Sequence, residues 1–576
     1  MPTFRLLSRP HRKDRVGRRP KATAAVAPAA AAAAVVVLLA LFCASAGGAC
    51  TNLIVTPGAS ADGSTIVTYT CDGEFHPILR RSSAADHGPD DVVEIRSWSG
   101  ELQGTIPQVP HTFAVVNLMN EYQVTIGETT FDGRLELQDP DGLVHYWWLM
   151  RLALERAGTA REAIEVMAAL VAEHGYASTG ETFSIADPDE AWIMEMIGRG
   201  PSGDHPERKG AVWVARRIPD GMICAHANLA RIHTFPLEDP ENCLYSPDVV
   251  DFAVDQGFFD PRGGRPFSFR EAYCPATPQT LRYTATRVWS LFRRAAPSQD
   301  WPEDYHRGVA GAEPYPLWTE PDARLSVNDV FALMRDHYEG TPYDMTEGVD
   351  AGPFGCPVRV QPMGWEVDGE KFTWERPIST KKTGFSMVSQ SRRWLPDAVG
   401  GLQWYGVDDT AVTCYVPLYC GIDALPQSFA TGSLQGYSDE SAWWVFNLVG
   451  NYANLRYRDM IQDIQTVQHE LEGHFLALQP AVEQTAVALA KTDPELLRRY
   501  LTDYSVQQAE LTVDRWRALG KHLITKYNDG YVKDDRGRPQ EVGYPETWLR
   551  DVLKVRPDQF RLPETQTDSL QTELPY

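Results

Sequence analysis

The 576-residue sequence predicts an α+β protein in which antiparallel sheets are covered by helices. Two observations lead to this class. Apolar and polar residues alternate in short segments separated by turn-forming residues, as in β-hairpins. Between and after these segments, apolar residues recur every three or four positions, as on one face of a helix. The chain is long enough for two or three domains, or for one large domain with extensions.

The first predicted strands form two hairpins. Residues 51–57, TNLIVTP, and 64–70, STIVTYT, flank the turn GASADG. Residues 111–118, HTFAVVNL, and 122–130, YQVTIGETT, flank MNE. We expect antiparallel pairing within each hairpin, because alternating segments joined by a short turn favour it.

Helices and further hairpins alternate along the next part of the chain. Residues 146–174 predict two helices that break near Gly158, where AGT supplies a stop and an N-cap. Two more hairpins are expected, with turns at DPDE in residues 182–197 and at PDG in residues 210–228. Residues 231–350 are rich in Pro and Gly and contain short helices, of which TPQTLRYTATRVWSLFRRAA is the clearest.

Strands return between residues 370 and 425, in KFTWERPI, GLQWYGVD and TAVTCYVPLY. Residues 438–527 have a helical period, and residues 528–576 form a polar, Pro-rich tail. We therefore expect a sheet-containing domain over 50–437 and a helical region that packs on it or continues it. Covering the sheets and forming a homo-oligomer are both open roles for this helical region.

Residues 1–49 have the order of a signal peptide: a basic segment, the apolar run VVVLLALF and the small residues ASAGGA. A retained membrane anchor is one alternative, because the apolar stretch from Ala22 approaches the ~20 residues that span a bilayer. Pro28 interrupts that stretch. Another kind of targeting peptide is the remaining alternative.

Two cleavage points fit the rule that small residues precede the cut, one after Ala46 and one after Ala49. The second leaves Cys50 as the first residue. A lipidation signal would also retain Cys50, but it normally has an aliphatic residue where this chain has Gly47. We expect signal peptidase to mature a secreted or periplasmic protein that contacts membranes only through its leader.

Charge and ligand patterns exclude several functions. The formal net charge is −23, and since the leader holds eight basic residues and one acidic residue, the rest of the chain carries −30. Such a body repels nucleic acid. No CxxC pair offers thiolate ligands to zinc, and His469 and His474 in HELEGH are five positions apart where a zinc-binding helix needs four. We expect no metal and no cofactor. Cys414 and Cys420, in the segment CYVPLYC, could form a disulfide bridge across a short turn.

Cys50 is the strongest candidate for catalysis. A cysteine at the start of a chain has a base attached to its own backbone, because the free α-amine has a reference pKa of about 8. The neutral amine can take the thiol proton, and the thiolate can then attack a carbonyl. A structural or lipidated cysteine is the alternative.

The sequence from Cys50 resembles the mature start of the C69 family of dipeptidases, which are N-terminal nucleophile hydrolases. The start CTNLIVTPGASADGSTIV is joined in order by NLMNEYQVTIGETT, AWIMEMIG, ICAHANLARI, TATRVWSLFR, GPFG, QSRRWLPDAVGGLQWYG, VPLYCGIDALP and SAWWVFNLVGNYA. The resemblance covers residues 50–480. It implies an αββα sandwich of two antiparallel sheets between helical layers, and amide-bond hydrolysis without metal or cofactor.

The resemblance also implies roles for single residues. Cys50 is the expected nucleophile, forming a thioester acyl-enzyme with dipeptides or short peptides. Asp72 matches an aspartate that holds the nucleophile and its amine, Asn120 an oxyanion-hole donor, and Asn228 a second asparagine near the site. The family has Arg and Asn where this chain has Tyr69 and Thr70, which puts a cationic contact from that strand in doubt.

Three further points stay open at this stage. Arg231 and Arg287 could bind a substrate carboxylate, although exposed ion pairs are the expected arrangement. The chain could be an N-acyl amide hydrolase of the penicillin V acylase or choloylglycine hydrolase type. It could also be a secreted binding protein without activity on the same fold.

Overall fold

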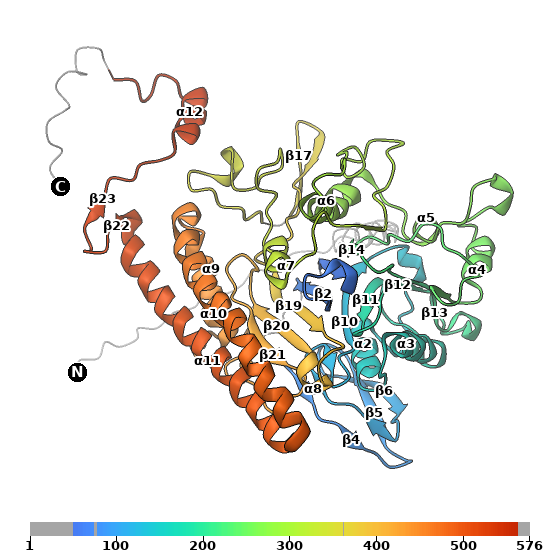
Figure 1. Ribbon diagram of the computed structural model, residues 1–576. Helices are drawn as coiled ribbons and strands as arrows, with labels where there is room; N and C mark the ends of the chain where they lie inside the picture. The colour runs from blue at the N-terminus through green and yellow to red at the C-terminus, as the bar shows by residue number, and fades with distance from the viewer. Residues whose placement is uncertain (1–49, 74–77, 361, 563–576) are drawn as a thin grey trace, which may run out of the picture. The chain divides into compact units, whose positions relative to one another are not determined.

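The computed structural model describes residues 50–73, 78–360 and 362–562. Within this part of the chain, two antiparallel sheets form the centre of the fold and helices cover them (Figure 1). The predicted α+β class is therefore confirmed. The predicted leader lies outside the described residues.

The two sheets are named A and B. Sheet A has, in spatial order, the strands β16 (Trp318–Thr319), β14 (Ile223–His226), β1 (Asn52–Val55), β2 (Thr65–Asp72), β19 (Thr383–Ser391), β20 (Leu402–Val407) and β21 (Val416–Tyr419). Sheet B has β15 (Cys243–Tyr245), β13 (Ala211–Arg217), β12 (Ala191–Gly198), β11 (Gly180–Ala186), β10 (Thr125–Phe131), β9 (Met119–Asn120), β8 (Val115–Val116) and β3 (Arg81–Ser82).

Shorter strand pairs and the helices complete the fold. The pairs are β4 (Ala85–Asp86) with β7 (His111–Thr112), β5 (Val92–Arg96) with β6 (Leu102–Pro107), β17 (Gly364–Val367) with β18 (Glu370–Thr373), and β22 (Val532–Lys533) with β23 (Pro539–Gln540). The helices are α2 (Tyr146–Leu154), α3 (Ala160–His174), α4 (Val249–Asp255), α5 (Phe269–Tyr273), α6 (Pro278–Ala295), α7 (Val327–Met334), α8 (Asp397–Gly400), α9 (Ala442–Ala453), α10 (Tyr457–Thr492), α11 (Pro494–Tyr527) and α12 (Glu546–Val555).

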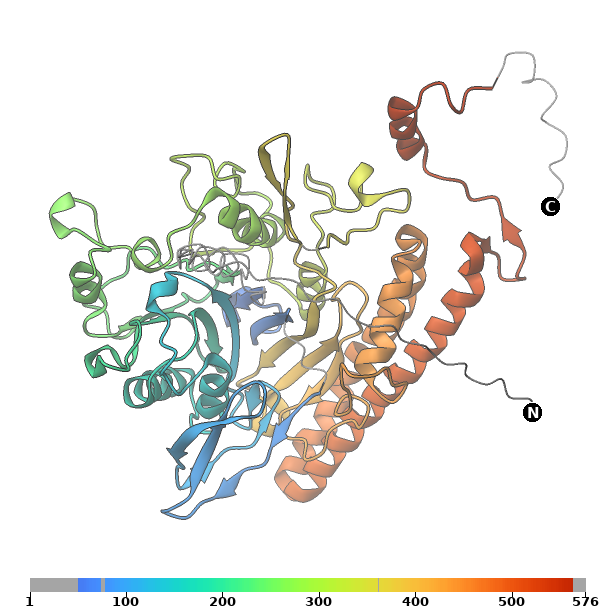
Figure 2. The same ribbon diagram turned by 180° about the vertical axis from the view of Figure 1, so that it is seen from behind.

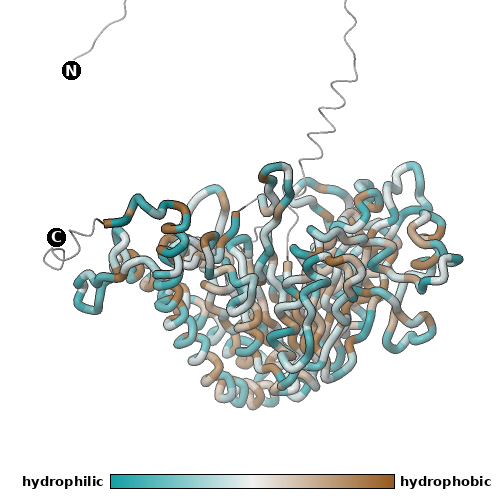
Figure 3. The backbone as a smooth tube through the Cα atoms, turned by 90° about the horizontal axis from the view of Figure 1, so that it is seen from above, coloured by the Kyte–Doolittle hydropathy of each residue, from teal (hydrophilic) through white to brown (hydrophobic). Residues whose placement is uncertain are grey.

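Sheets A and B pack closely where β10 approaches β1 and β2. Gly127 of β10 faces this contact, and a Cβ atom there would lie 3.1 Å from Cβ of Tyr69 and 2.7 Å from the side-chain amide of Asn52. A side chain at this position would push the sheets apart, so glycine is required. Apolar residues gather in the interior of the fold, and polar residues gather in its outer loops (Figure 3).

Helices cover both sheets. α2 and α3 pack on sheet B, while α9 and the long helices α10 and α11 pack on sheet A; α10 and α11 lie side by side (Figures 1 and 2). The helix pair predicted for residues 146–174 is confirmed, and Thr159 caps α3 by accepting a hydrogen bond from the backbone N–H of Glu162. His469 and His474 are exposed on α10.

The first and third predicted hairpins are confirmed, since β1 pairs with β2 and β11 with β12. The second is not one hairpin. The chain turns twice there, pairing β8 with β9 and β9 with β10, and Asn117 and Gln123 adopt positive φ angles of 51° and 67° at these turns. Sequence alternation cannot reveal this, because a two-residue strand is too short to show a period.

The hairpin predicted over residues 210–228 is wrong. β13 pairs with β12 and β15 in sheet B, whereas β14 pairs with β1 in sheet A, where Asn52 lies opposite His226. The PDG segment therefore carries the chain from one sheet to the other. This crossing brings the residues after β14 next to Cys50.

Sheet A also contains β19, a strand that the sequence patterns did not predict. It lies between β2 and β20 and is buried along its whole length. Because both of its faces are covered, its residues need not alternate. The cysteine bridge considered for Cys414 and Cys420 is absent from the structure: both thiols are free and buried, and Cys420 donates to the backbone oxygen of Asp397.

Candidate active site

Cys50 is anchored at the start of β1 between the two sheets. Only 3% of the residue is exposed. The backbone N–H of Thr51 donates to Oγ1 of Thr70 at 2.9 Å, which ties the beginning of the strand to β2. The thiol donates to Oε1 of Glu128 on β10 at 3.5 Å. The predicted nucleophile therefore lies in the contact between sheets A and B.

Arg287 of α6 holds the backbone of Cys50. Its guanidinium donates to the carbonyl oxygen of Cys50 at 2.7 Å and to Oγ1 of Thr51 at 2.9 Å. The residue is fully buried, and burial lowers its pKa to about 9. The expectation that Arg287 forms an exposed ion pair is wrong, because α6 turns this face of the helix toward the core.

Asp72 lies at the end of β2 and is also fully buried. Its carboxylate accepts hydrogen bonds from Oγ1 of Thr70 at 2.8 Å, from a guanidinium nitrogen of Arg376 at 2.6 Å and from the hydroxyl of Thr383. The cation that strand β2 lacks is thus supplied from another part of the chain. Arg376 escaped the sequence analysis because it is far from Asp72 along the chain and no local motif marks it.

Tyr69 stands where the resemblance leads one to expect an arginine. Its hydroxyl donates to Oε1 of Glu128 at 2.5 Å, the same oxygen that accepts from the Cys50 thiol. The ring is fully buried and meets Phe385 edge-to-face. Strand β2 therefore presents a hydroxyl, rather than a cation, to this side of the site.

The surroundings hold the Cys50 thiol in its protonated form. Burial raises the pKa of the thiol well above its usual value, and the negative charges of Glu128 and Asp72 act in the same direction. A hydrogen bond from the backbone N–H of Asp72 opposes these effects. At neutral pH the thiol therefore needs a base before it can act as a nucleophile.

Asn228 lies beside Arg287 in the loop after β14. Its backbone adopts a left-handed conformation with a φ of 59°. Its side-chain oxygen accepts from Arg287 at 2.8 Å and its amide donates to the carbonyl of Thr130 at 2.6 Å. Asn228 thus orients the arginine that holds Cys50, so the structure brings Cys50, Asp72 and Asn228 into one site.

Asn120 is placed differently. Its amide nitrogen donates to the carbonyl oxygens of Leu154 and Ala157, at 2.9 and 2.7 Å, and its oxygen accepts from the N–H groups of Tyr122 and Val124. Both amide hydrogens are engaged, so binding an oxyanion would require one of these bonds to break. The oxyanion role of Asn120 stays a prediction.

Replacing Asn120 by alanine separates a structural role of this side chain from a role as an oxyanion donor. From the four hydrogen bonds, we expect Asn120→Ala to lower the free energy of unfolding by about 3 kcal/mol, because buried backbone groups lose their partners. We expect kcat/KM per folded molecule to fall less than about tenfold, whereas loss of an oxyanion donor costs about 10²–10³-fold. Denaturant unfolding and a peptide-hydrolysis assay on the same sample measure both quantities. A loss of 100-fold or more without destabilisation contradicts the structural role.

The imidazole of His226, on the strand next to β1, links sheet A to sheet B. His226 of β14 hydrogen-bonds Thr129 and Ser184 of sheet B, each at 2.7 Å, and Ser184 in turn bonds Asn52. Burial lowers the pKa of His226 to about 3, so the imidazole is neutral at pH 7. The hydrogen bonds of this histidine are used to fix β14 against sheet B.

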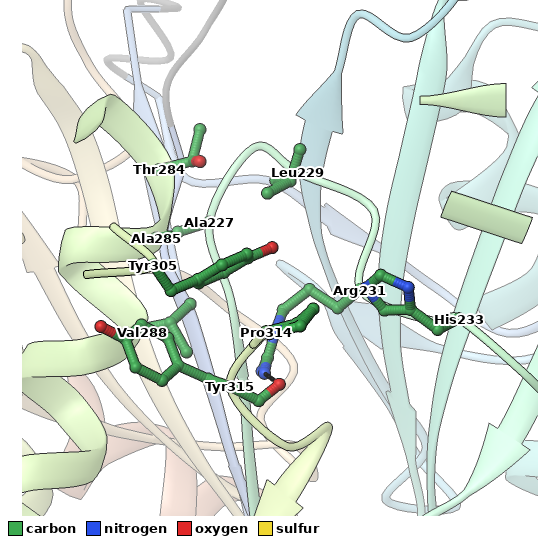
Figure 4. A pocket seen from close by; sticks show the side chains of 10 residues that line it. All are labelled: Ala227, Leu229, Arg231, His233, Thr284, Ala285, Val288, Tyr305, Pro314 and Tyr315. Atoms are coloured by element: carbon green, nitrogen blue, oxygen red, sulfur yellow. Dashed lines mark hydrogen bonds between the residues drawn. The ribbon is translucent and has the colours of Figure 1, made fainter. Parts of the chain in front are cut away.

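Two cavities adjoin the site. One, of about 200 Å³, is lined by Arg376 and by three further basic side chains, Arg359, Lys381 and Lys382. The other is small, about 10 Å³, and lies between α6 and the loop after β14. Figure 4 shows Arg231 beside Tyr305 and Tyr315 there. Arg231 donates to the backbone oxygens of Ala225 and Tyr315, so the expectation of an exposed ion pair is wrong for this residue too.

In the described residues, no three His, Cys, Asp or Glu side chains gather in a way that would hold a metal ion. Over the same ranges, no helix combines the length and the apolar character needed to cross a bilayer.

A buried thiol that lies between two antiparallel sheets, with its backbone held by a buried arginine, is suited to hydrolytic chemistry once a base removes its proton. Comparison with known families agrees: the family model described as peptidase family C69 matches residues 49–470. The protein is thus a peptidase, a hydrolase of peptide bonds. The chain belongs to peptidase family C69.

Curated relatives carry dipeptidase names. A probable dipeptidase of Salmonella dublin is 26% identical over 429 residues, which cover 69% of this chain and 88% of the relative. A dipeptidase of Bifidobacterium longum is 24% identical over 498 residues, covering 79% and 84%. Dipeptidase A of Lactobacillus helveticus is 23% identical over 433 residues, covering 71% and 82%.

Proposed function

We propose that this protein is a dipeptidase that works as an N-terminal nucleophile hydrolase, with Cys50 as the first residue of the mature chain. The names of its curated relatives support the activity. The observation that carries the mechanism is the position of Cys50, buried between two helix-covered antiparallel sheets and fixed through its own carbonyl by Arg287. We assign the fold to the αββα sandwich of this class.

In this mechanism, cleavage of the Ala49–Cys50 bond frees the amine that activates the thiol. The neutral amine takes the thiol proton, and the thiolate attacks the scissile carbonyl. The protonated amine then gives its proton to the departing amino acid, leaving a thioester on Cys50. Water, activated by the same amine, hydrolyses this thioester and regenerates the thiol. Asp72 and Asn228 position the arginines around the start of β1.

The basic cavity beside Arg376 suits the other end of the substrate. A dipeptide carries a free carboxylate one residue beyond the scissile bond, and cationic side chains bind carboxylates through charge-assisted hydrogen bonds. Lys382 is exposed at this cavity. We assign the cavity to the C-terminal half of the dipeptide.

Maturation tests this mechanism directly. We expect the active, secreted or periplasmic protein to begin at Cys50, because only that cut by signal peptidase places an amine on the nucleophile. N-terminal sequencing and intact mass measure the first residue. Full activity in a protein that begins at Gly47 would overturn the mechanism, and a diacylglycerol on Cys50 would assign the leader to a lipoprotein.

Substrate comparison tests the activity. The mature protein is assayed with unblocked dipeptides, with N-acyl amino acids and with penicillin V. We expect kcat/KM for the dipeptides to exceed kcat/KM for the N-acyl compounds by at least about 100-fold. The opposite preference would assign the protein to the N-acyl amide hydrolases, and hydrolysis of neither class would favour a binding protein.

A further inference from the structure

Cys71 is a second cysteine on β2, the strand that lies next to the start of β1. Thr51 lies opposite Thr70, in the same antiparallel register that pairs the two strands further along. One more step along each strand places Cys50 opposite Cys71. Both residues are nearly inaccessible, with 3% and 1% exposure, and each carries a thiol in the structure. The nucleophile therefore has another cysteine as its cross-strand neighbour.

The backbone places these two cysteines at the closer kind of cross-strand position. The N–H of Thr70 donates to the carbonyl oxygen of Thr51 at 3.2 Å, so these two residues are a hydrogen-bonded pair. The next pair outward, Cys50 with Cys71, is then a non-hydrogen-bonded pair, whose Cα atoms lie about 4.5 Å apart in an antiparallel sheet. Disulfides span Cα separations of about 4.4–6.8 Å. The expected spacing falls within the range that a disulfide can bridge.

Both side chains belong to the face of sheet A that meets sheet B. Residues two apart in a strand share a face, so Cys71 lies on the same face as Tyr69. The Tyr69 hydroxyl and the Cys50 thiol donate to the same carboxylate oxygen of Glu128, on sheet B. Burial is the main cause that raises the pKa of the Cys50 thiol, and a negative charge on Cys71 raises this pKa further. The two sulfur atoms therefore share the space between the sheets.

We propose that Cys50 and Cys71 are a site of oxidative modification, at which a small-molecule disulfide converts the two thiols into a cross-strand disulfide that blocks the nucleophile until a thiol reduces it. The bond follows from the strand register, whereas the loss of activity rests on the proposed function of Cys50. The proposed export of the chain would bring both thiols into a compartment where disulfides persist. The path that admits a scissile carbonyl to Cys50 also admits a small oxidant.

The reaction is two successive thiol–disulfide exchanges. The α-amine takes the Cys50 proton, and the thiolate attacks one sulfur of the small disulfide and breaks its S–S bond. The departing thiolate takes up that proton, and a mixed disulfide remains on Cys50. The amine then takes the proton of Cys71, whose thiolate attacks Sγ of Cys50 and releases the second small thiol with this proton. The two protein thiols are oxidised to one disulfide, and the reagent is reduced to two thiols.

The test treats the fully reduced mature protein with bis(2-hydroxyethyl) disulfide. We expect the intact mass to fall by two hydrogen atoms, and a digest without reduction to contain the peptides of Cys50 and Cys71 joined. Dipeptide hydrolysis should fall at least about tenfold, because a cysteine in a disulfide cannot act as a nucleophile. Dithiothreitol should restore it to within about twofold of the untreated sample.

Cys71→Ser separates the two exchanges. This variant keeps the size of the side chain and lacks the second thiol, so we expect it to hydrolyse dipeptides before treatment and to stop at the mixed disulfide afterwards, with a gain in mass. Cys71→Ala gives the same readout if the serine variant does not fold, and thermal unfolding identifies a misfolded sample. Cys224→Ser is the matched control: Cys224 is also buried but lies opposite Ile54, and its treated form should contain the same joined peptides as the wild type.

A wild type that retains the mixed disulfide overturns the proposal, because Cys71 would then be unable to reach Sγ of Cys50. A Cys50 that stays unmodified, or that is joined to a different cysteine, overturns it as well. Failure of the proposed function is recognised separately. In that case the joined peptides form, but the peptidase activity of the treated protein is unchanged.

Discussion

Replacing Cys50 by alanine should abolish dipeptide hydrolysis, lowering kcat of the mature protein by at least about 10⁴-fold. The substitution removes one sulfur atom from a buried position and leaves the backbone bonds of Cys50 to Arg287 intact. The fold should therefore persist, and the loss is attributable to chemistry. Steady-state hydrolysis of a dipeptide, followed by release of the free amino acids, measures the effect.

Cys224→Ala provides the control for this experiment. Cys224 lies on β14, opposite Ile54 of β1, and is as deeply buried as the nucleophile. Burial raises the pKa of its thiol to about 12, so it remains inert. We expect this variant to retain activity within about twofold. Activity that survives in Cys50→Ala would place the nucleophile elsewhere in the chain.

The elements of the fold could be predicted where one pattern describes them completely. β1, β2, β11 and β12 alternate between turns, and α2 and α3 carry a helical stripe and the cap Thr159, so local sequence was sufficient. Pairing between distant segments could not be predicted. The residues of β13 and β14 look like a hairpin, yet each strand pairs in a different sheet, because partner choice depends on packing that alternation does not encode.

In the site, too, residues marked by a local motif could be predicted, whereas residues placed by long-range contacts could not. Cys50 could be predicted because it stands directly after small residues that fit a cleavage point, and Asp72 was predicted through the resemblance to the C69 family. Arg376 and Glu128 could not, since each acquires its role only when a distant segment is placed against β1 or β2. Arg287 was expected on the surface because arginines usually are exposed. In the fold its guanidinium is buried and donates to the backbone oxygens of Tyr283, Cys50 and Ala227 and to the side chain of Asn228. The sequence around Arg287 does not reveal the partners that lie far along the chain.

The buried ion pair between Arg376 and Asp72 should carry the largest effect on stability. Both side chains are nearly inaccessible to solvent, with 4% and 0% exposure, and they meet at 2.6 Å. Arg376→Met keeps an apolar side chain of similar length and leaves the Asp72 carboxylate with hydroxyl donors only. We expect the free energy of unfolding to fall by about 3–5 kcal/mol, because one partner of a buried pair is left uncompensated.

The counterpart Arg515→Met isolates burial as the cause. Arg515 also forms an ion pair: two of its nitrogens lie 2.9 and 2.7 Å from the carboxylate oxygens of Glu470, but this pair lies on the exposed faces of α10 and α11. We expect a loss below about 1 kcal/mol there. Denaturant unfolding of the mature protein measures both variants, and equal losses would contradict the assignment of Arg376 to a buried charge pair.

Removing both charges of the Arg376–Asp72 pair separates its role in folding from its role in catalysis. In Arg376→Met with Asp72→Asn, neither an unpaired carboxylate nor an unpaired guanidinium remains, so the double variant should be more stable than the sum of the single losses predicts. Activity should nevertheless stay low, because Asp72 and Arg376 together fix the strand end that faces Cys50. Recovered stability without recovered turnover would show that this charge pair was retained for the geometry of the nucleophile. Recovery of both would assign the pair to folding alone.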